Sequence, residues 1–220
     1  MHGYLSDKRS FIRQLDFFSN YFQVFAFDFK GFGENVGMEY PYSLDDYVSE
    51  LIEFCKANNI VKPHVLAHSF GARVALKLAC QNSQFFDKLV LTGAAGLKSR
   101  LTVKKVVKQT AFNVLKAFIP REKLKAFYSP DYLALDEIMK QSFVKIVSEH
   151  LDYTLPFIQN QTLLIFGKND KETPLYMAKK LNNGIKNSKL IILENAGHFA
   201  FIDRTLKFNL EMREFLLSKD

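Results

Sequence analysis

Ser69 stands in a sequence context that could turn a hydroxyl into a nucleophile. The residues from Pro63 to Ala67 read as a short apolar strand, and those after the serine carry apolar side chains at helical spacing as far as Gln81. A tight strand-to-helix turn requires small residues two positions before and two positions after the serine, and Ala67 and Gly71 meet that requirement. The start of the helix would also direct free N–H groups at negative charge beside the serine. A buried serine that caps the helix is the alternative interpretation.

Asp170 and His198 supply the other two residue types that acyl transfer needs. Such a reaction uses a nucleophile, a base that takes its proton, and a carboxylate that orients and stabilises the base. Asp170 follows a predicted strand at 162–166, and His198 follows one at 189–193. Because functional side chains in α/β proteins gather at the carboxyl ends of parallel strands, we expect both residues to lie near Ser69.

Other interpretations of these residues stay open. Asp170 could be only a turn residue or helix cap before Pro174, and His198 could be only a loop histidine with ordinary hydrogen-bond partners. Asp203 and Glu194 are rival carboxylates, although neither falls at an independent strand end. The place of Asp170 after a strand of its own favours it as the orienting carboxylate.

The elements that must position these residues alternate between strands and helices. The strand interiors are apolar throughout, which is typical of a mostly parallel sheet covered by helices on both faces. We therefore expect an α/β fold. Predicted strands span 22–27, 63–67, 88–93, 162–166 and 189–193, and predicted helices span 9–18, 44–58, 175–182, 206–217 and the run after Ser69.

Residues 98–156 interrupt this alternation. They are helical in pattern and lack strand signals, so we expect a helical cap inserted into a core made of residues 1–97 and 157–220. The apolar residues of the insertion recur at spacings of three and four, which predicts that most of these apolar residues form the interior of the cap. A few could line an acyl pocket over Ser69, because ligand pockets are mainly apolar.

The net charge of +7 is concentrated in part of this insertion. Between residues 98 and 125, nine basic residues accompany a single acid, Glu122. Such an excess is typical of a solvated face, and attraction of anionic substrates or of a membrane surface is the alternative. There are no zinc-ligand pairs, no phosphate-binding loop and no aromatic signature of RNA binding, so we expect no nucleic-acid partner.

The remaining composition indicates a globular cytoplasmic protein. Apolar residues make up 48% of the 220 and charged residues 24%, and no apolar run is long enough to span a membrane. The first residues do not form a signal peptide. Cys55 and Cys80 lie in separate predicted helices without metal-ligand spacing, which favours buried thiols in a reducing compartment.

Taken together, these motifs resemble the α/β-hydrolase-fold family, in its capped, small-esterase form. The order serine, aspartate, histidine matches that family. Five short stretches carry the resemblance and cover nearly the whole chain outside the cap. They are His-Gly-Tyr at 2–4, Asp-x-x-Gly-x-Gly at 28–33, the serine turn at 67–71, Gly-Lys-Asn-Asp at 167–170 and Ala-Gly-His at 196–198.

The resemblance implies a role for each site residue. Ser69 would be the nucleophile, His198 the general base and then the general acid, and Asp170 the carboxylate that holds the histidine tautomer. The backbone N–H groups of Tyr4 and Phe70 would form the oxyanion hole. No metal and no cofactor are implied. We interpret Asp28 separately, as a structural residue that binds the backbone of the glycine loop.

The chain departs from the family pattern at its beginning. In the family a buried strand precedes the His-Gly motif, whereas here His2 is the second residue, so the N-terminal strands are apparently lacking. The sheet would then have a gap, re-pair, or borrow a strand from another molecule, and exposed edges would permit an oligomer. A truncated sequence is the simplest explanation. The departure bears on the position of Tyr4 rather than on Ser69, Asp170 or His198.

The site residues and the family resemblance together predict a serine hydrolase that cleaves a small, fairly apolar carboxylic ester through an acyl-enzyme, with thioesters as related substrates. A carbon–carbon hydrolase or lyase that uses the same three residues is the enzymatic alternative. A non-catalytic ligand receptor and an inactive truncated product are alternatives of a different class.

Overall fold

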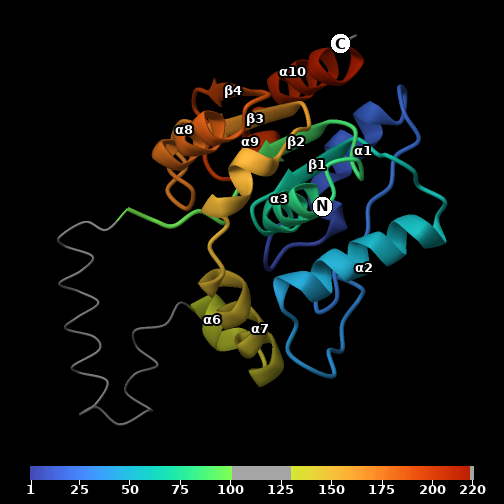
Figure 1. The fold of residues 1–220 in the computed structure, drawn as a ribbon, viewed down its shortest axis with the longest axis vertical. Coiled ribbons are helices and arrows are strands. Elements are labelled where there is room, and N and C mark those ends of the chain that lie inside the picture. Colours follow the sequence, from blue (N-terminus) through green and yellow to red (C-terminus); the bar gives the residue numbers. More distant parts are fainter. Residues whose placement is uncertain (101–129, 219–220) are drawn as a thin grey trace.

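The computed structural model describes residues 1–100 and 130–218. In these residues four parallel strands form one sheet in the order β1-β2-β3-β4, which confirms the expected α/β fold with a parallel sheet (Figure 1). The register pairs Ala67 with Leu91 and Leu91 with Leu164. The strands are β1 (Val65–His68), β2 (Leu89–Thr92), β3 (Thr162–Gly167) and β4 (Ser188–Leu193).

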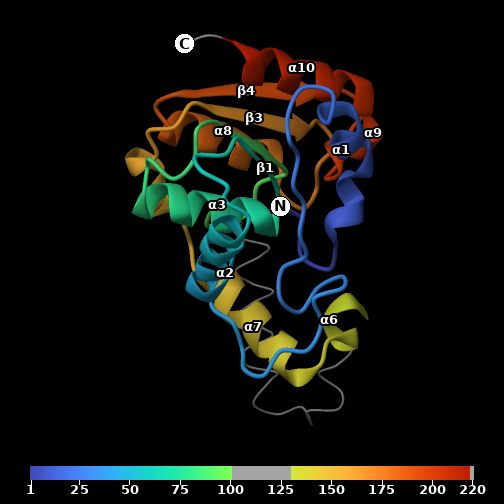
Figure 2. The same ribbon diagram turned by 90° about the vertical axis from the view of Figure 1, so that its right-hand side faces the viewer.

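One face of the sheet is covered by three helices. Alternate residues of the strands, such as Leu89, Leu91 and Leu164, are fully buried in the core that these helices share. Figure 2 shows α3 on this side of the sheet with α2 beyond it. The helices are α2 (Leu44–Ala57), α3 (Phe70–Gln81) and α8 (Leu175–Gly184).

The other face carries a second core. The intervening strand residues Val90, Leu163 and Ile165 point into it, so that both faces of the strands are apolar, as a sheet covered on both sides requires. Figure 2 shows α10 lying along β3 and β4. The helices on this face are α1 (Ile12–Phe18), α9 (Ala200–Asp203) and α10 (Thr205–Leu217), and a 3-10 turn, η1 (Lys8–Phe11), precedes α1.

Helix α2 begins where the sequence predicts, because its first turn is capped. The Ser43 hydroxyl accepts a hydrogen bond from the Asp46 N–H at 3.3 Å, and the Asp46 carboxylate accepts one from the Ser43 N–H at 2.6 Å. This reciprocal pair satisfies two backbone donors that the helix itself leaves free. The helix therefore presents a fixed face to α3, against which it packs.

The inserted region is described from residue 130 onward. Residues 101–129, with most of the basic run and the first apolar stripe of the expected cap, lie outside the described residues. The remainder is helical: α6 (Pro130–Ala134), α7 (Glu137–Ser148) and the 3-10 helix η3 (Asp152–Phe157). In Figure 1, α6 and α7 lie beside α2, away from the sheet. Their assignment to a separate cap stays a prediction.

Segment 22–27 is not a strand, so this part of the sequence-based prediction is wrong. A groove of about 440 Å³ separates the segment from β1, and residues of the segment and of β1 line it. A strand exists only through pairing with a neighbour, and this segment pairs with none of the described strands, so its apolar side chains stay partly exposed along the groove. Beside the groove, the Met1 amine donates to the Leu66 carbonyl at 2.7 Å and the His68 N–H donates to the Met1 carbonyl at 3.0 Å.

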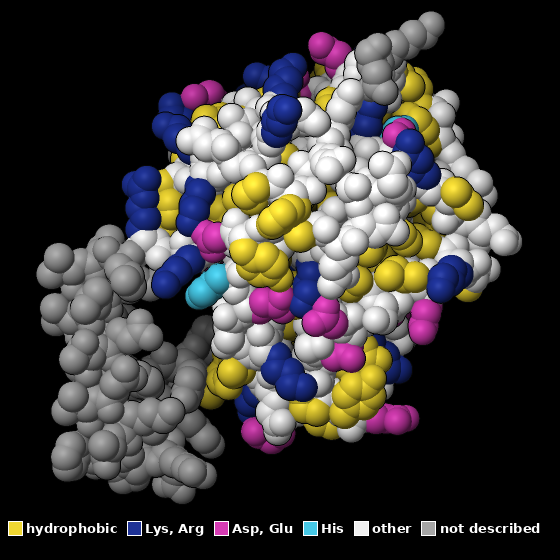
Figure 3. All heavy atoms as spheres, in the orientation of Figure 1, with side chains coloured by type: hydrophobic (Ala, Val, Ile, Leu, Met, Phe, Trp, Pro, Cys, Tyr) yellow, Lys and Arg dark blue, Asp and Glu magenta, His cyan; other side chains and the backbone are white. Residues whose placement is uncertain are grey.

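The described surface carries no dominant basic patch on the face shown in Figure 3, where Lys and Arg side chains are dispersed among acidic and apolar ones. Among the helices of residues 1–100 and 130–218, none is long and apolar enough to cross a membrane.

Candidate active site

Ser69 occupies the turn between β1 and α3 in a strained backbone conformation. Its φ of 48° and ψ of −104° lie in a region that side chains other than glycine rarely adopt. As the residue before the helix it makes no side-chain capping hydrogen bond, so the alternative of a helix-capping serine is wrong. The Ser69 hydroxyl is therefore not used in a capping hydrogen bond to the backbone of α3.

The chain start packs tightly against this turn. The Gly71 N–H donates to the His2 carbonyl at 3.0 Å, and a Cβ at position 71 would lie 2.7 Å from the Met1 carbonyl oxygen. Only a glycine permits that approach of two backbones. A Cβ at Gly3 would likewise lie 2.7 Å from the His68 ring. These contacts place residue 4 next to the serine.

Asp170 and His198 are joined directly. The His198 Nδ1 lies 2.9 Å from the Asp170 Oδ2, which also accepts a hydrogen bond from the Thr173 hydroxyl at 2.7 Å. The backbone N–H groups of Glu172 and Thr173 donate to the other carboxylate oxygen, at 2.9 Å each. Burial alone would raise the pKa of Asp170, but the hydrogen bonds from His198 and Thr173 outweigh it and lower this pKa below its usual value. An ionised Asp170 fixes the proton of His198 on Nδ1 and leaves Nε2 as the basic nitrogen.

The rival carboxylates have other partners. Asp203 accepts the Gly197 N–H at 2.7 Å and so holds the loop that carries the histidine, whereas Glu194 forms an ion pair with Lys168 at 2.9 Å on the surface. Of the three candidate acids, Asp170 is the one that contacts the His198 ring.

His198 reaches the serine turn through His68. The two imidazole rings have their centroids 4.6 Å apart, and the His68 Nε2 lies 3.1 Å from the His198 carbonyl oxygen. A Cβ at Gly93 would lie 3.0 Å from the His198 ring, so this ring also sits over the end of β2. In the described part of the chain, no hydrogen bond links the Ser69 hydroxyl to His198.

His68 is a site residue that the sequence reasoning missed. It is 2% exposed, and burial lowers its pKa to about 3, so the ring is neutral at physiological pH. A neutral ring next to a carbonyl donates its Nε2 proton, which leaves Nδ1 without a partner among the described residues. Its position directly before the serine was the available signal, but its partner lies 130 residues away in sequence.

Tyr4 and Phe70 lie beside Ser69, and no hydrogen bond from their N–H groups is formed within residues 1–100 and 130–218. All three residues line one cavity of about 150 Å³. The rings of Tyr4 and Phe70 pack edge to face, with centroids 5.7 Å apart, and the Tyr4 hydroxyl donates to the Met139 carbonyl on α7 at 3.1 Å. The other lining residues are Arg73, Ala95, Phe143, Ile146 and Val147.

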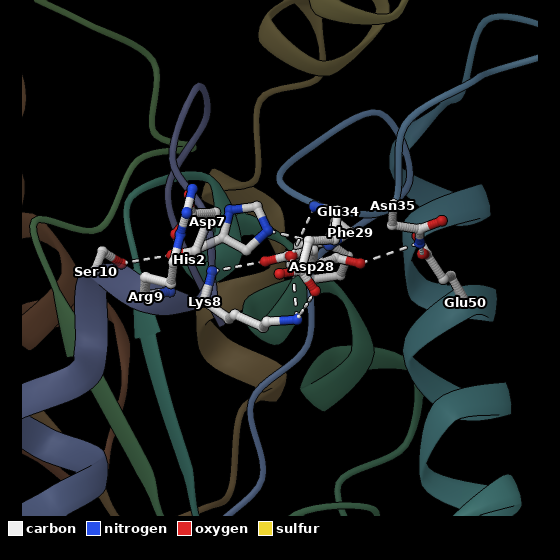
Figure 4. Close-up of polar contacts among 10 residues, drawn as sticks. All are labelled: His2, Asp7, Lys8, Arg9, Ser10, Asp28, Phe29, Glu34, Asn35 and Glu50. Carbon is white, nitrogen blue, oxygen red and sulfur yellow. Dashed lines mark hydrogen bonds and ion pairs between the residues drawn. The ribbon is translucent and has the colours of Figure 1, made fainter.

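Asp28 does not line this cavity. Figure 4 shows it between Lys8 and Glu34, where it joins segment 2–8 to the glycine loop. Its two carboxylate oxygens accept the Lys8 N–H at 2.7 Å and the Glu34 N–H at 2.9 Å. Nearby, the His2 ring accepts the Phe29 N–H at 3.0 Å. Segment 2–8 is thereby tied to the glycine loop at two points, in agreement with a structural role for Asp28.

Within the described residues, no group of three or more His, Cys, Asp or Glu side chains is arranged to hold a metal ion. The cavity itself is lined by Ser69, by the guanidinium-bearing Arg73 and by Tyr4 and Phe70. The histidine bound to a carboxylate, His198 with Asp170, approaches the serine turn through its contact with His68.

Comparison with known proteins places this arrangement in a family context. Residues 1–209 match the alpha/beta hydrolase family. The sequence is 26% identical, over 90% of this chain and 75% of the relative, to a 2-hydroxy-6-oxo-6-(2'-aminophenyl)hexa-2,4-dienoic acid hydrolase of Metapseudomonas resinovorans. An esterase from Exiguobacterium antarcticum has a similar structure, with a TM-score of 0.79 and 24% identity over 99% of this chain and 90% of that one. A meta-cleavage product hydrolase from Pseudomonas fluorescens superposes with a TM-score of 0.73 and 24% identity over 96% and 85% of the two chains. At these identities the two structures show the shared fold alone.

Proposed function

Because the chain belongs to the alpha/beta hydrolase family, we propose that it is a serine hydrolase that cleaves a small, fairly apolar carboxylic ester through an acyl-enzyme. The observation that carries the proposal is the 2.9 Å hydrogen bond between His198 Nδ1 and a buried, ionised Asp170. A bond of this kind leaves the Nε2 of the histidine basic, which serves a base that must deprotonate a hydroxyl. The strained, uncapped Ser69 is the hydroxyl that it would serve.

In the proposed reaction Ser69 Oγ attacks the ester carbonyl while His198 Nε2 takes the hydroxyl proton. Asp170 stabilises the imidazolium that forms, and the N–H groups of Tyr4 and Phe70 bind the oxygen that becomes negative. The imidazolium then gives its proton to the departing alcohol, which leaves an acyl group on Ser69. Water, deprotonated by the same histidine, releases the acid and restores the serine.

The cavity supports a small substrate. Its volume of about 150 Å³ leaves room for a short chain, and the aromatic and aliphatic side chains of Tyr4, Phe143 and Val147 form much of its wall. An apolar wall of this kind favours an acyl chain over a strongly polar group. Thioesters fit the same site, because the attack is on the same carbonyl carbon.

Carbon–carbon bond hydrolysis is the second candidate. It is favoured by the similarity to the Metapseudomonas resinovorans relative, a hydrolase of a dienoic acid, which is 26% identical to this chain. The same residues would serve that reaction, with the leaving group a carbanion equivalent rather than an alcohol. Turnover of simple aryl esters alone would favour esterase activity, and turnover of a vinylogous 1,5-diketo acid in preference to esters would favour the second candidate.

A fluorophosphonate probe tests the proposal, since it forms a stable bond only with an activated serine. We expect one adduct by intact mass, mapped to Ser69, absent from Ser69→Ala and retained in Ser49→Ala, whose serine lies exposed on α2. An unlabelled wild-type protein that is folded, or an adduct that persists in Ser69→Ala, would overturn the serine-hydrolase proposal and favour a ligand receptor.

A further inference from the structure

Arg73 lines the same cavity as Ser69. The two residues are one turn apart at the start of α3, which separates their backbones by about 6 Å along the helix axis. Arg73 is 9% exposed, which is rare for a charged side chain that has no ion pair in the described part of the chain. The cavity therefore has a hydroxyl at one point of its wall and a guanidinium at another.

Within residues 1–100 and 130–218, Arg73 forms hydrogen bonds to backbone carbonyls and no ion pair, although the nearby Glu149 carboxylate favours its charged form. Its Nη1 donates to the carbonyl oxygens of Ile146 at 2.8 Å and Glu149 at 3.0 Å, near the end of α7. Among the described residues, its Nε and Nη2 have no partner and no carboxylate forms an ion pair with it. The Glu149 carboxylate is bound instead to Lys77, at 2.7 Å.

Burial lowers the pKa of Arg73 to about 10, so the group keeps its charge at neutral pH. A buried charge is costly unless a group of opposite sign meets it. Two carbonyl oxygens supply partial negative charge to one nitrogen only. The edge formed by Nε and Nη2 is the kind of planar pair that binds both oxygens of a carboxylate.

We propose that Arg73 binds a carboxylate at the far end of the substrate's acyl group, so that the preferred substrates are hemiesters of short dicarboxylic acids. The inference rests on the proposed serine hydrolase and narrows its substrate to an apolar chain with one anionic end. The carboxylate belongs to the acyl part because that part stays attached to Ser69 after the alcohol leaves, in the cavity that Ser69 and Arg73 share. With carbon–carbon bonds of about 1.5 Å, a chain of four or five carbons spans a distance of that order.

The test compares 4-nitrophenyl hemisuccinate with the neutral 4-nitrophenyl pentanoate. We expect the wild type to have the higher kcat/KM for the hemiester. Arg73→Gln should lower the ratio of the two kcat/KM values by roughly tenfold to a hundredfold, the range for a lost hydrogen bond to a charged group. Arg73→Lys should keep part of the preference. Lys140→Gln is the matched control, because it removes the same charge from an α7 side chain that is paired with Glu137 and does not line the cavity.

The outcomes separate this inference from the proposed function. Hydrolysis of the neutral ester by the wild type, with no preference for the hemiester, would overturn the role of Arg73 and leave the serine hydrolase standing; this result needs no variant. An unchanged ratio in a folded Arg73→Gln would do the same. Turnover of neither ester, together with no fluorophosphonate adduct on Ser69, would overturn the proposed function itself.

Discussion

His68 and His198 lie with their rings 4.6 Å apart, and the His68 Nε2 is 3.1 Å from the His198 carbonyl oxygen. The contact joins the residue directly before the serine to the backbone of the histidine loop. Asp170 fixes the ring of His198 from one side, and His68 fixes its main chain from another. His198 is thus held at two points, which is the preorganisation that proton transfer would require if it acts as the proposed base.

Replacing His68 by phenylalanine tests this contact. Phenylalanine keeps the size of the ring but has no donor for the His198 carbonyl, so the histidine loop should lose its register with Ser69. We expect kcat to fall on the order of tenfold to a hundredfold, with a smaller change in KM, because sub-ångström misplacement of a base affects the chemical step. Steady-state kinetics measures this. His64→Gln, at the other end of the same stretch of chain, serves as the control, and an equal loss in both variants would contradict a specific role for His68.

Asp170→Asn should impair the reaction far more than Asp203→Asn. An asparagine would favour the wrong tautomer of His198, and such a change in a serine–histidine–aspartate site typically lowers kcat by about ten-thousandfold. Among the described residues the Asp203 carboxylate accepts a single hydrogen bond, from the Gly197 N–H, so its replacement should cost less than about tenfold. Hydrolysis rates of both variants decide between the two carboxylates. If Asp203→Asn were the more damaging, Asp203 rather than Asp170 would be the orienting acid.

The pH dependence of stability should carry a signature of His68. Its pKa in the folded protein is about 3, whereas an unfolded histidine titrates near 6.5. Because the unfolded chain binds this proton first, the contribution of His68 is complete above pH 6.5 and is lost as the pH falls toward 3. The midpoint of urea unfolding should therefore fall more steeply with decreasing pH in the wild type than in His68→Phe.

Because Glu50 also changes stability with pH, the pH dependence of the wild type must be compared with that of His68→Phe rather than interpreted alone. Burial raises the pKa of Glu50 to about 7, so its contribution to stability is present at low pH and is lost as the pH rises from 4.5 to 7, opposite in sign to that of His68. Subtracting the curve of His68→Phe from that of the wild type removes this effect. Parallel curves for the two proteins between pH 4.5 and 6.5 would contradict a buried neutral His68.

Ser69→Gly should be more stable than Ser69→Ala. Both lose the hydroxyl, but only glycine adopts a φ of 48° without strain from a Cβ atom. Such strain costs about 1–3 kcal/mol, partly offset by the greater freedom of glycine in the unfolded chain, so a net difference of about 1 kcal/mol is expected. Denaturant unfolding of the two inactive proteins measures it. Equal stabilities would mean that the turn stores no strain at residue 69.

The sequence predicted well those features that depend on neighbouring residues. Apolar runs that end in Ser69, Asp170 and His198 marked the carboxyl ends of strands, because a buried parallel strand must be apolar along its length. The structure brings Asp170 and His198 together as expected and places Tyr4 and Phe70 beside Ser69.

Features that depend on distant partners were not predictable in the same way. Segment 22–27 has the composition of a strand, but pairing decides whether it becomes one, and it faces a groove instead. The sequence pattern assigned no site role to His68, which lies in the predicted turn, or to Arg73, which lies in the predicted helix. Their importance comes from carbonyl groups 130 and 73 residues further along the chain, which no local pattern shows.

Gly33→Ala should destabilise the protein through Asp28 and thereby reduce activity. A Cβ at this position would lie 2.3 Å from the Asp28 carboxylate and would force it away from the Lys8 and Glu34 N–H groups. We expect a loss of about 2–4 kcal/mol in unfolding free energy, from the strain at a positive φ and from broken charge-assisted hydrogen bonds.

Gly37→Ala is the matched control, because Gly37 also has a positive φ but has nothing within 4 Å of the added carbon. The control should lose only the strain, about 1 kcal/mol, and keep its activity, since segment 2–8 and Tyr4 would stay in place. Urea unfolding and ester hydrolysis of both variants give the comparison, and equal effects would show that Asp28 does not hold segment 2–8.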